Sequence, residues 1–534
     1  MTAPGAPASF DPEGHIWDVV VIGTGAGGAT AGFALAQSGK SVLFLERGKA
    51  LDQDPGVTRG QPFAWDGGTE SALNHGWWPE PMIRRYGPHQ VPGHQPIGAG
   101  TGGSTSVFGM VMDRLRPGDF TPRQFYPAAS DSSLPDSWPI GYDKLAPFYE
   151  QAEKQFRVRG TLDPLGPRRS ALLPPPEPTA RETAVSGALS DCGLHPYRIP
   201  YAQDRVEGCQ GCAAMLCPRE CRNDAARMCL RPAMQHHGAQ LLTGCRVVRL
   251  EEQGRAIQSA TCDWQGKRLA VRGRIFVLAA NAFMTPDLLL RSANQNFPDG
   301  LANSSGLVGR NLMLHASDFL LVQSKRNARG VAPAMNHGLS LNDFYSHRGD
   351  KLGNVHVHPV HVTGDMTLAF MRMHMKRLNR LPLPLLSAAA SVGAMMHRSS
   401  LVFSTVLEDL PYVCNRVIAR KDGDAGVSYD YRHPHELRER SWKLFLGFKA
   451  AAAKHFSVRP LRPVGLLNVS HVCGTCRFGD DSETSVLDRE NRTHDLDNLY
   501  VVDASFFPSS GGINPSLTIA ANALRVGQTI ACRL

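Results

Sequence analysis

A short apolar run followed by three closely spaced glycines constrains the fold of this chain more than any other feature. Residues 18–22 read Asp-Val-Val-Val-Ile, which is typical of a strand buried on both faces of a parallel sheet. Gly23, Gly25 and Gly28 follow directly in the spacing G-x-G-x-x-G. The first glycine permits a tight turn, the second lets the backbone approach a pyrophosphate, and the third lets a helix pack closely on the strand. The run therefore predicts the start of a nucleotide-binding βαβ unit.

The residues after these glycines fit the rest of such a unit. The next stretch is rich in alanine and predicts a helix whose amino end, with its free N–H groups, favours anions. Residues 41–45 predict the second strand. Glu46 ends that strand about 20 positions after the glycines, where an acidic residue commonly bonds a ribose hydroxyl. Strand, helix, second strand and acid together predict a Rossmann-type dinucleotide-binding domain, without separating NAD from FAD.

Length and charge narrow the class of protein. The chain has 534 residues, which predicts two large domains that can interleave. The net charge is +9, but no dense basic run with interleaved aromatic residues occurs, so we expect no nucleic-acid binding. The mild positive excess suits an anionic partner or a membrane surface. Residues 1–14 predict a disordered lead-in without the features of a signal peptide, so we expect a cytoplasmic protein.

A second glycine-rich loop lies well outside the first unit. Residues 96–110 contain Gly102 and Gly103, followed by small hydroxyl residues that begin with Ser104. Backbone N–H groups that glycines leave free form concave sites for anions. Apolar residues such as Val107 flank this loop, so we interpret it as a phosphate-contacting turn rather than a flexible surface loop.

Residues 366–398 combine an apolar core with basic flanks. The core, residues 381–396, is too short and too broken by prolines to span a bilayer. We interpret the segment as a buried helix pair that lines a substrate cavity. The alternative is a peripheral membrane contact, with the apolar face down and basic residues such as Arg372 and Arg380 at the lipid headgroups.

The carboxyl-terminal part of the chain carries the most specific motifs. Residues 470–479 read Ser-His-Val-Cys-Gly-Thr-Cys-Arg-Phe-Gly, and residues 512–519 read Gly-Ile-Asn-Pro-Ser-Leu-Thr-Ile. With residues 485–488 and 497–505, these segments strongly resemble the end of the glucose–methanol–choline (GMC) oxidoreductases, a family of FAD enzymes. The resemblance implies that the dinucleotide is FAD.

Two further landmarks extend the resemblance over nearly the whole chain. They are residues 100–105 and residues 278–292, which look like a second family signature with Asn281 where glycine is usual. The resemblance implies an α/β fold in which a Rossmann-type FAD-binding domain carries a discontinuous α+β substrate domain. We expect the FAD-binding domain at 15–130, 200–330 and 465–534, and the substrate domain at 131–199 and 331–464.

The resemblance also implies which residues contact FAD. The ADP half would lie against the first glycine turn, and the flavin against the second glycine loop and the carboxyl-terminal segments. The implied residues are Gly23, Gly25, Gly28, Glu46 and Val247 for the ADP half; Gly102, Gly103, Ser104 and Val107 for the pyrophosphate and flavin; and Asp503, Ala504 and Pro515 for the ribityl chain and the ring.

Two neighbouring residues depart from the family pattern. Some members attach FAD covalently through a histidine at the position of Val107. The next position is often asparagine in the family, but here it is Phe108. We therefore expect FAD to be bound non-covalently, in a pocket that is more apolar than usual.

His471 matches the catalytic histidine of the family, and Asn514 stands where members have a second histidine or an asparagine. Oxidising an alcohol removes a hydroxyl proton and a carbon-bound hydride. An imidazole can accept that proton at neutral pH, while the flavin takes the hydride. We therefore expect oxidation of the CH–OH group of an alcohol or sugar-like substrate, with His471 as base. The alternatives are an oxygen-using alcohol oxidase and a flavin-holding lyase of the same fold.

Four cysteines crowd into one short stretch. Cys209, Cys212, Cys217 and Cys221 have the spacing C-x2-C-x4-C-x3-C, and dense cysteines beside a Cys-Pro pair occur in iron–sulfur loops. The stretch also resembles the cysteine region of bacterial sugar dehydrogenase flavoprotein subunits, some of which carry a three-iron cluster. We expect Cys212, Cys217 and Cys221 as ligands, with Cys209 optional; zinc, disulfides and plain thiols are the alternatives. A cluster would favour a dehydrogenase that passes electrons to an acceptor protein or a quinone.

Overall fold

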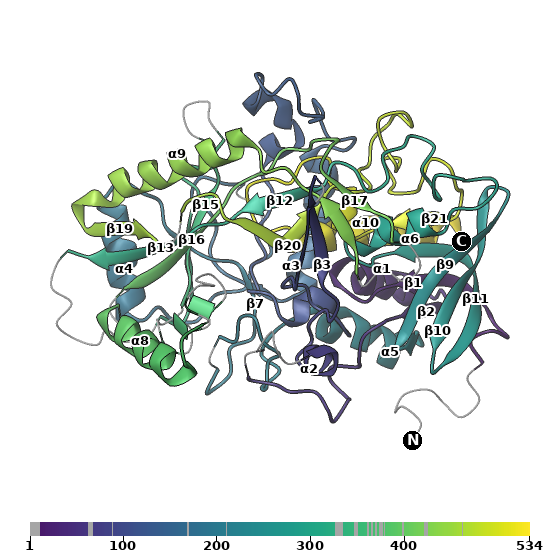
Figure 1. Ribbon diagram of the computed structural model, residues 1–534, viewed down its shortest axis with the longest axis horizontal. Coiled ribbons are helices and arrows are strands. Elements are labelled where there is room, and N and C mark those ends of the chain that lie inside the picture. The colour runs from purple at the N-terminus through teal and green to yellow at the C-terminus, as the bar shows by residue number, and fades with distance from the viewer. Residues whose placement is uncertain are drawn as a thin grey trace.

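The computed structural model of the chain is drawn in Figure 1. Of the predicted lead-in, residues 1–10 lie outside the described part of the chain. The structure describes residues 11–61, 63, 68–87, 89–167, 170–209, 211–325, 335–346, 351–359, 363–364, 367–368, 371–372, 378, 380–397, 400–420, 426–461 and 463–534.

A seven-stranded sheet forms one half of the molecule. Its strands run in the order β8-β2-β1-β11-β10-β9, and β21 also pairs with β11. β1 is parallel to both β2 and β11, so the first apolar run lies inside the sheet, where Val19 and Val20 are fully buried. The strands are β1 (Ile16–Ile22), β2 (Val42–Leu45), β8 (Gln240–Leu242), β9 (Cys245–Gln253), β10 (Ala256–Trp264), β11 (Lys267–Leu278) and β21 (Leu499–Val501).

Helices from both ends of the chain pack together on this sheet. α1 (Ala26–Gln37) follows the glycine turn, and its Gly32 lies so close to the ring of Phe44 on β2 that a side chain would have no room. α10 (Ser516–Arg533) packs on α1, with Gly527 against Ala31. The carboxyl-terminal segment therefore shares a core with the first βαβ unit. The other helices of this half are α3 (Tyr142–Gln155), α5 (Arg231–His237) and α6 (Met284–Arg291).

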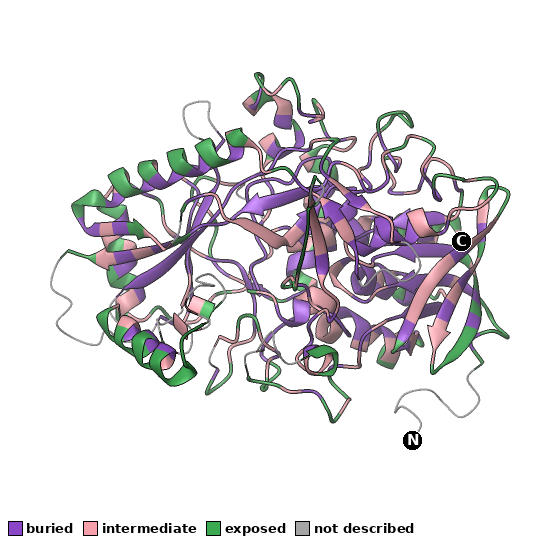
Figure 2. Ribbon diagram, viewed as in Figure 1, coloured by how far each residue is buried: buried purple, intermediate pink, exposed green. Residues whose placement is uncertain are grey.

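An antiparallel six-stranded sheet forms the other half. α9 (His435–Ala451) packs on it through Phe448 against Phe403, and α4 (Ala180–Ser190) contributes Leu189 to the same core. Figure 2 shows the exposed outer side of α9 beside the buried strands. The strands, in sheet order, are β19 (Phe456–Pro460), β13 (Phe319–Ser324), β16 (Leu401–Val406), β15 (Asn354–Val357), β14 (Leu339–Leu341) and β6 (Tyr197–Arg198).

Short elements complete the fold. β12 (Met313–Ala316) pairs with β20 (Leu467–Cys473), and β5 (Val158–Arg159) pairs with β7 (Tyr201–Ala202). β17 (Arg416–Ile418), β18 (Ser428–Asp430), β3 (Met82–Tyr86) and β4 (His89–Gly93) form a four-stranded sheet. The remaining elements are α2 (Gly68–Asn74), the 3-10 helices η1 (Gly103–Ser106), η2 (Pro117–Phe120), η3 (Pro122–Phe125), η6 (Ala452–Lys454) and η7 (Ala504–Phe506), and the π-helix η4 (Ala226–Leu230). The domain boundaries stay a prediction.

Helix α8 (Leu383–Met396) lies at the surface of the second half. Its buried residues are Leu386, Ala390 and Ala394, and its opposite side is exposed. The interpretation of residues 366–398 as a buried helix pair is therefore wrong for α8, because its described neighbours cover one side only. Much of the remaining segment, including 373–377, lies outside the described residues. Within the described part of the chain, no helix is long and apolar enough to cross a membrane.

Candidate active site

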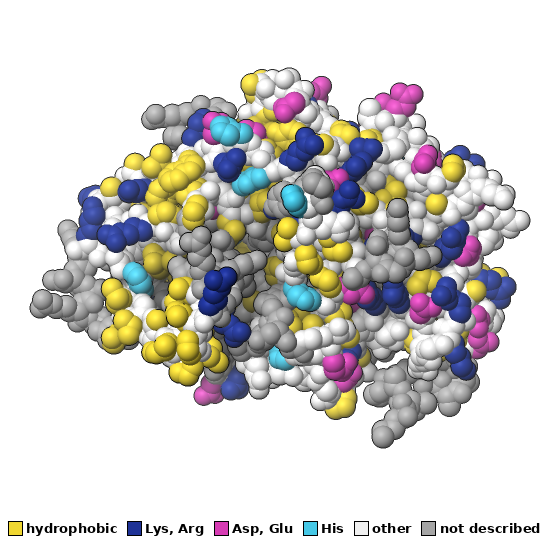
Figure 3. Space-filling view, viewed as in Figure 1, with side chains coloured by type: hydrophobic (Ala, Val, Ile, Leu, Met, Phe, Trp, Pro, Cys, Tyr) yellow, Lys and Arg dark blue, Asp and Glu magenta, His cyan; other side chains and the backbone are white. Residues whose placement is uncertain are grey.

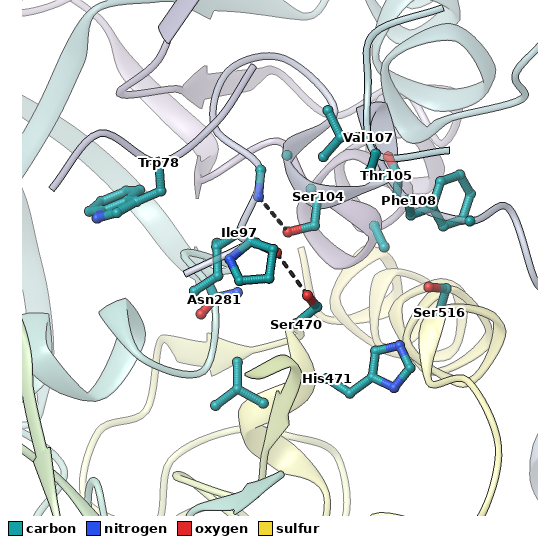
Figure 4. Close-up of a pocket in the computed structure, with 18 of the residues that line it drawn as sticks. Trp78, Ile97, Ser104, Thr105, Val107, Phe108, Asn281, Ser470, His471 and Ser516 are labelled. Atoms are coloured by element: carbon teal, nitrogen blue, oxygen red, sulfur yellow. Dashed lines mark hydrogen bonds between the residues drawn. The ribbon is translucent and has the colours of Figure 1, made fainter. Parts of the chain in front are cut away.

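A cavity of about 890 Å³ is lined by residues of both large sheets and of the loops between them. The first glycine turn, the second glycine loop and His471 all line this one space, part of which is drawn in Figure 4. We call the part lined by Gly23, Gly25 and Glu46 the nucleotide side, and the part lined by His471 and Asn514 the catalytic side. Most of the predicted site residues line the cavity; Gly28, Gly102 and the four cysteines do not.

Backbone contacts explain the glycines of the first turn. Gly23 has a φ of +97°, and a β-carbon there would collide with the backbone of Ala279. Gly28 lies behind the cavity, where a β-carbon would collide with the carbonyl of Gly23. Gly25 differs, because no atom lies within 4 Å of where its β-carbon would stand. This open space faces the cavity at the amino end of α1, so it fits the approach of a pyrophosphate.

Glu46 is buried at the end of β2 and lines the nucleotide side. Its Oε2 accepts hydrogen bonds from the backbone N of Thr24 at 3.1 Å and from Thr24 Oγ1 at 2.6 Å. Its Oε1 accepts one from the backbone N of Gly48 at 2.9 Å. Burial raises the pKa of Glu46, and these hydrogen bonds oppose the rise. A further backbone hydrogen bond from Gly100 also reaches this carboxylate, so the loop amides fix Glu46 firmly at the edge of the nucleotide side.

The second glycine loop packs directly against the first turn. Gly103 has a φ of +53°, and a β-carbon there would lie 2.9 Å from Cα of Gly25. Gly102, with a φ of +86°, lets the chain turn into η1. Ser104 Oγ accepts a hydrogen bond from the backbone N of Gly98 at 3.1 Å, drawn in Figure 4. The two glycine segments therefore form one continuous backbone surface in the cavity.

The two residues that depart from the family pattern in this loop both line the cavity. Val107 is buried, and Phe108 follows it along the wall, as labelled in Figure 4. Neither side chain carries a nucleophile that could bond to a flavin. The third departure, Asn281, has a φ of +87°, which glycine adopts freely and which asparagine tolerates better than most residues.

Asp503 and its neighbours bring the carboxyl-terminal motif to the cavity. Asp503 Oδ2 accepts hydrogen bonds from the backbone N of Asn281 at 3.1 Å and from Thr285 Oγ1 at 2.5 Å. Burial raises the pKa of Asp503, and its hydrogen bonds, including those from Ser505 and Thr285, oppose the rise. Ala504, Pro515 and Val247 also line the cavity, and their contacts with FAD stay a prediction.

His471 lies on β20, with each ring nitrogen near another side chain. Its Nδ1 is 2.9 Å from Nδ1 of His315, and its Nε2 is 3.4 Å from Nδ2 of Asn514. Burial holds the pKa of His471 well below its usual range, and the neighbouring histidines lower that pKa further. His471 is therefore neutral at pH 7. The structure brings the two predicted catalytic residues together on one side of the cavity.

His315 is the residue that sequence reasoning missed. Its Nε2 lies 3.1 Å from the carbonyl oxygen of Ser510, which can only accept a hydrogen bond, so this nitrogen carries the proton. Burial lowers the pKa of His315 to about 4, so the ring is neutral and its Nδ1 is bare. Nδ1 of His471 must then donate to His315, which leaves a lone pair on Nε2 of His471. No local sequence pattern predicts the contact between His315 and His471, because it depends on the pairing of β12 with β20.

The cysteine stretch gathers its thiols behind the second glycine loop. Sγ of Cys221 lies 3.3 Å from Sγ of both Cys209 and Cys217, and Cys212 contacts Cys217. Contact with the Cys221 thiol lowers the pKa of Cys209 to about 6. The backbone N of Ala214 donates to the carbonyl of Val107 at 3.0 Å, so this loop abuts the cavity wall.

These sulfur contacts do not match a bound metal. Four sulfurs at 2.3 Å around one tetrahedral metal lie roughly 3.8 Å apart, and cluster ligands lie farther apart still. Among the described residues, no group of three or more His, Cys, Asp or Glu side chains is arranged to hold a metal ion. The four cysteines meet as predicted, but their role as iron–sulfur ligands stays a prediction.

Two family models, both described as GMC oxidoreductase, match residues 21–317 and 460–523 of the chain. The chain belongs to the GMC oxidoreductase family. The resemblance, the fold class and the enzyme class inferred from the sequence motifs are thereby confirmed. GMC oxidoreductases bind FAD, and the paired glycine loops and the cavity fit that cofactor.

Known proteins align with this GMC oxidoreductase over almost its full length. Paromamine 6'-oxidase of Streptomyces fradiae is 31% identical over 97% of this chain and 92% of its own. Fructose dehydrogenase large subunit of Gluconobacter japonicus is 25% identical over 96% of this chain and 97% of its own. The crystal structure of pyridoxine 4-oxidase from Mesorbium loti superposes with a TM-score of 0.63 at 21% identity, covering 96% of this chain and 99% of that one. The two sequence relatives thus include both an oxidase and a dehydrogenase.

Proposed function

We propose that this GMC oxidoreductase oxidises the CH–OH group of an alcohol or sugar-like substrate, with His471 as the base. The observation that carries the proposal is the pairing of His471 and Asn514 in the cavity that the two glycine loops also line. FAD, when bound, supplies the hydride acceptor. The names of the relatives, which include a paromamine 6'-oxidase and a fructose dehydrogenase subunit, support a polyol or sugar-like substrate.

FAD is held without a covalent bond. Gly23, Gly25 and Glu46 would hold its ADP half, and Gly103 and Ser104 its pyrophosphate and flavin. Val247 would hold the adenine, and Asp503, Ala504 and Pro515 would hold the ribityl chain and the ring. Val107 supports non-covalent binding because its side chain cannot form the link that some relatives make. Acid precipitation of the holoenzyme should release all of the yellow flavin into the supernatant, and flavin retained in the pellet would contradict this point.

Nε2 of His471 accepts the hydroxyl proton of the substrate. The hydrogen bond between His471 and His315 holds the proton of His471 on Nδ1, so the lone pair on Nε2 is available throughout the neutral pH range. His315 is a positioning residue, since it acts on the tautomer and orientation of His471. The carbonyl oxygen of Ser510 accepts the hydrogen bond from Nε2 of His315 and thereby fixes the tautomer of the His315 ring.

Asn514 orients the substrate beside that base. Its Nδ2 lies 3.4 Å from Nε2 of His471, so a hydroxyl oxygen bound between the two can accept from the amide and donate to the imidazole. Among the described residues, Oδ1 of Asn514 has no hydrogen-bond partner. This oxygen is buried, so Nδ2, which faces His471, is the atom of Asn514 placed to donate to a substrate hydroxyl.

We assign dehydrogenase rather than oxidase activity, in which an acceptor protein or a quinone would take up the electrons that bound FAD collects. The cysteine stretch supports this assignment through its resemblance to that of sugar dehydrogenase flavoprotein subunits. The sulfur spacing does not fit a metal cluster, so these cysteines are not assigned as the electron path. Anaerobically purified protein should contain iron and acid-labile sulfide if the ligand prediction holds. Absence of both iron and acid-labile sulfide, together with disulfides between these cysteines, would show that the cysteine stretch only stabilises the fold.

Anaerobic mixing with candidate alcohols tests the reaction itself. A substrate should bleach the flavin absorbance without oxygen, whereas a lyase would convert its substrate with the flavin still oxidised. The acceptor that reoxidises the reduced flavin then distinguishes a dehydrogenase from an oxidase. A dye or quinone acceptor should restore the flavin much faster than air, and rapid hydrogen peroxide formation would assign an oxidase instead.

A further inference from the structure

Helix α8 exposes an apolar face that no described part of the chain covers. The helix holds no charged residue in its fourteen positions, and its polar side chains are two serines. A surface helix normally presents charged residues to water, and a helix that is apolar all round is normally buried. The exposed apolar side chains here are Leu381, Leu383, Leu385, Val392, Met395 and Met396, each between 46% and 69% accessible.

The opposite side of α8 belongs to the active-site cavity. Gly393 lines the cavity together with Thr367 and His397, while Leu386 and Ala390 are buried beneath the helix. The exposed residues Leu385, Val392 and Met396 recur at the spacing of one helix face, on the other side. Helix α8 therefore lies between the cavity and any molecule that contacts its outer face.

Positive charge lies beside part of this apolar face. From residue 366 to residue 407 the sequence contains no Asp and no Glu. Arg372 and Arg380 are exposed beside the helix. In Figure 3, hydrophobic side chains gather over α8 at the lower left, and Lys and Arg side chains lie next to them. An apolar strip with basic margins complements the headgroups and acyl boundary of an anionic bilayer.

We infer that α8 docks this enzyme on the surface of an anionic phospholipid bilayer, with the helix lying in the plane of the interface. Leu385, Val392 and Met396 enter the acyl boundary, and Arg372 and Arg380 meet the lipid phosphates. A second copy of the chain is the weaker occupant, because a two-fold contact across α8 would bring Arg380 of both copies to the same interface. The inference concerns the surface alone and does not depend on the identity of the substrate.

Sedimentation with vesicles tests the inference on the holoenzyme. Vesicles of phosphatidylcholine with one quarter phosphatidylglycerol should bind the wild-type protein, and vesicles of phosphatidylcholine alone should bind it less. The triple variant Leu385→Ser/Val392→Ser/Met396→Ser should lower the partition coefficient on the anionic vesicles at least about tenfold, because it removes apolar surface from the interface. The charge variant Arg372→Gln/Arg380→Gln should lose most of the preference for anionic lipid.

A matched variant separates the α8 face from general surface hydrophobicity. Leu162→Ser/Leu165→Ser/Leu446→Ser removes side chains of 43% to 54% accessibility elsewhere on the chain, and it should bind vesicles as the wild type does. Flavin content and activity with a soluble alcohol and dye should be unchanged in both triple variants. If the α8 triple variant loses its flavin, the single variant Leu385→Asp takes its place.

Three outcomes would overturn the inference. One is wild-type protein that stays in the supernatant with anionic vesicles. Another is an equal loss of binding in the α8 variant and its matched control. The third is a dimer that the α8 variant dissociates in analytical ultracentrifugation while vesicle binding is absent, which would assign the face to a second copy of the chain.

Discussion

The nucleotide side and the catalytic side of the cavity are built in different ways. The nucleotide side comes from contiguous stretches whose backbones nearly touch, as Gly103 touches Gly25. The catalytic side is assembled from single residues far apart in the sequence, such as His315, His471 and Asn514. On the first side the backbone dictates the residue type at Gly23 and Gly103, where a positive φ and a close backbone neighbour favour glycine. On the second side the chemistry depends on which side chains the fold brings together.

Replacing His471 by alanine should have the largest effect and should spare the nucleotide side. We expect flavin reduction by substrate to slow by about 10²–10⁴-fold, the usual contribution of a general base. The spectrum and affinity of bound FAD should stay unchanged, since the glycine loops are intact. Stopped-flow absorbance under anaerobic conditions measures the rate. Reduction at the wild-type rate would mean that another group takes the proton.

His315 tests whether the catalytic side depends on more than His471 itself. His315→Leu removes the acceptor for Nδ1 of His471, and we expect reduction to slow by about ten- to hundredfold, as for other groups that orient a functional histidine. His315→Asn keeps an acceptor oxygen and should recover part of the rate. The pH dependence of reduction should change in the leucine variant. Equal rates in the two variants, with normal FAD content, would show that His315 only fills space.

Gly103→Ala should weaken FAD binding on the nucleotide side and leave the reaction on the catalytic side nearly unchanged. The new β-carbon would lie 2.9 Å from Cα of Gly25, at a residue with a φ of +53°. Strain of about 1–3 kcal/mol predicts FAD binding weaker by about five- to hundredfold. Titration of the apoprotein with FAD measures the loss, and once saturated the variant should reduce at a nearly normal rate. Gly187→Ala is the control, because nothing lies within 4 Å of its β-carbon position.

The smallest expected effect is that of pH, because the rate of flavin reduction should hardly change across the neutral range. A histidine base is lost as pH falls through its folded-state pKa, and burial places the pKa of His471 well below 6.5. A histidine at its ordinary pKa would lose about three quarters of its base form at pH 6. We therefore expect flavin reduction by a non-ionising alcohol to be nearly constant from pH 8 to pH 6. A decline with a midpoint near 6.5 would mean that water reaches His471 in the working enzyme.

The sequence by itself determined the nucleotide side and the kind of reaction. Gly23, Gly28 and Gly103 could be recognised because positive φ angles and backbone contacts exclude every other residue, and such demands are local. The motif around His471 could be recognised because its glycine turn and neighbouring segments are contiguous. The φ of +87° at Asn281 favours glycine there and explains why asparagine, which tolerates positive φ, can replace it.

Only the tertiary structure decided the partner of His471 and the environment of α8. His315 and His471 are 156 positions apart and meet because β12 pairs with β20, a non-local contact that no local pattern encodes. The apolar composition of residues 383–396 favours a buried helix, but one side of this helix is exposed. Burial depends on what packs against a segment, and the described neighbours of α8 cover its inner side alone.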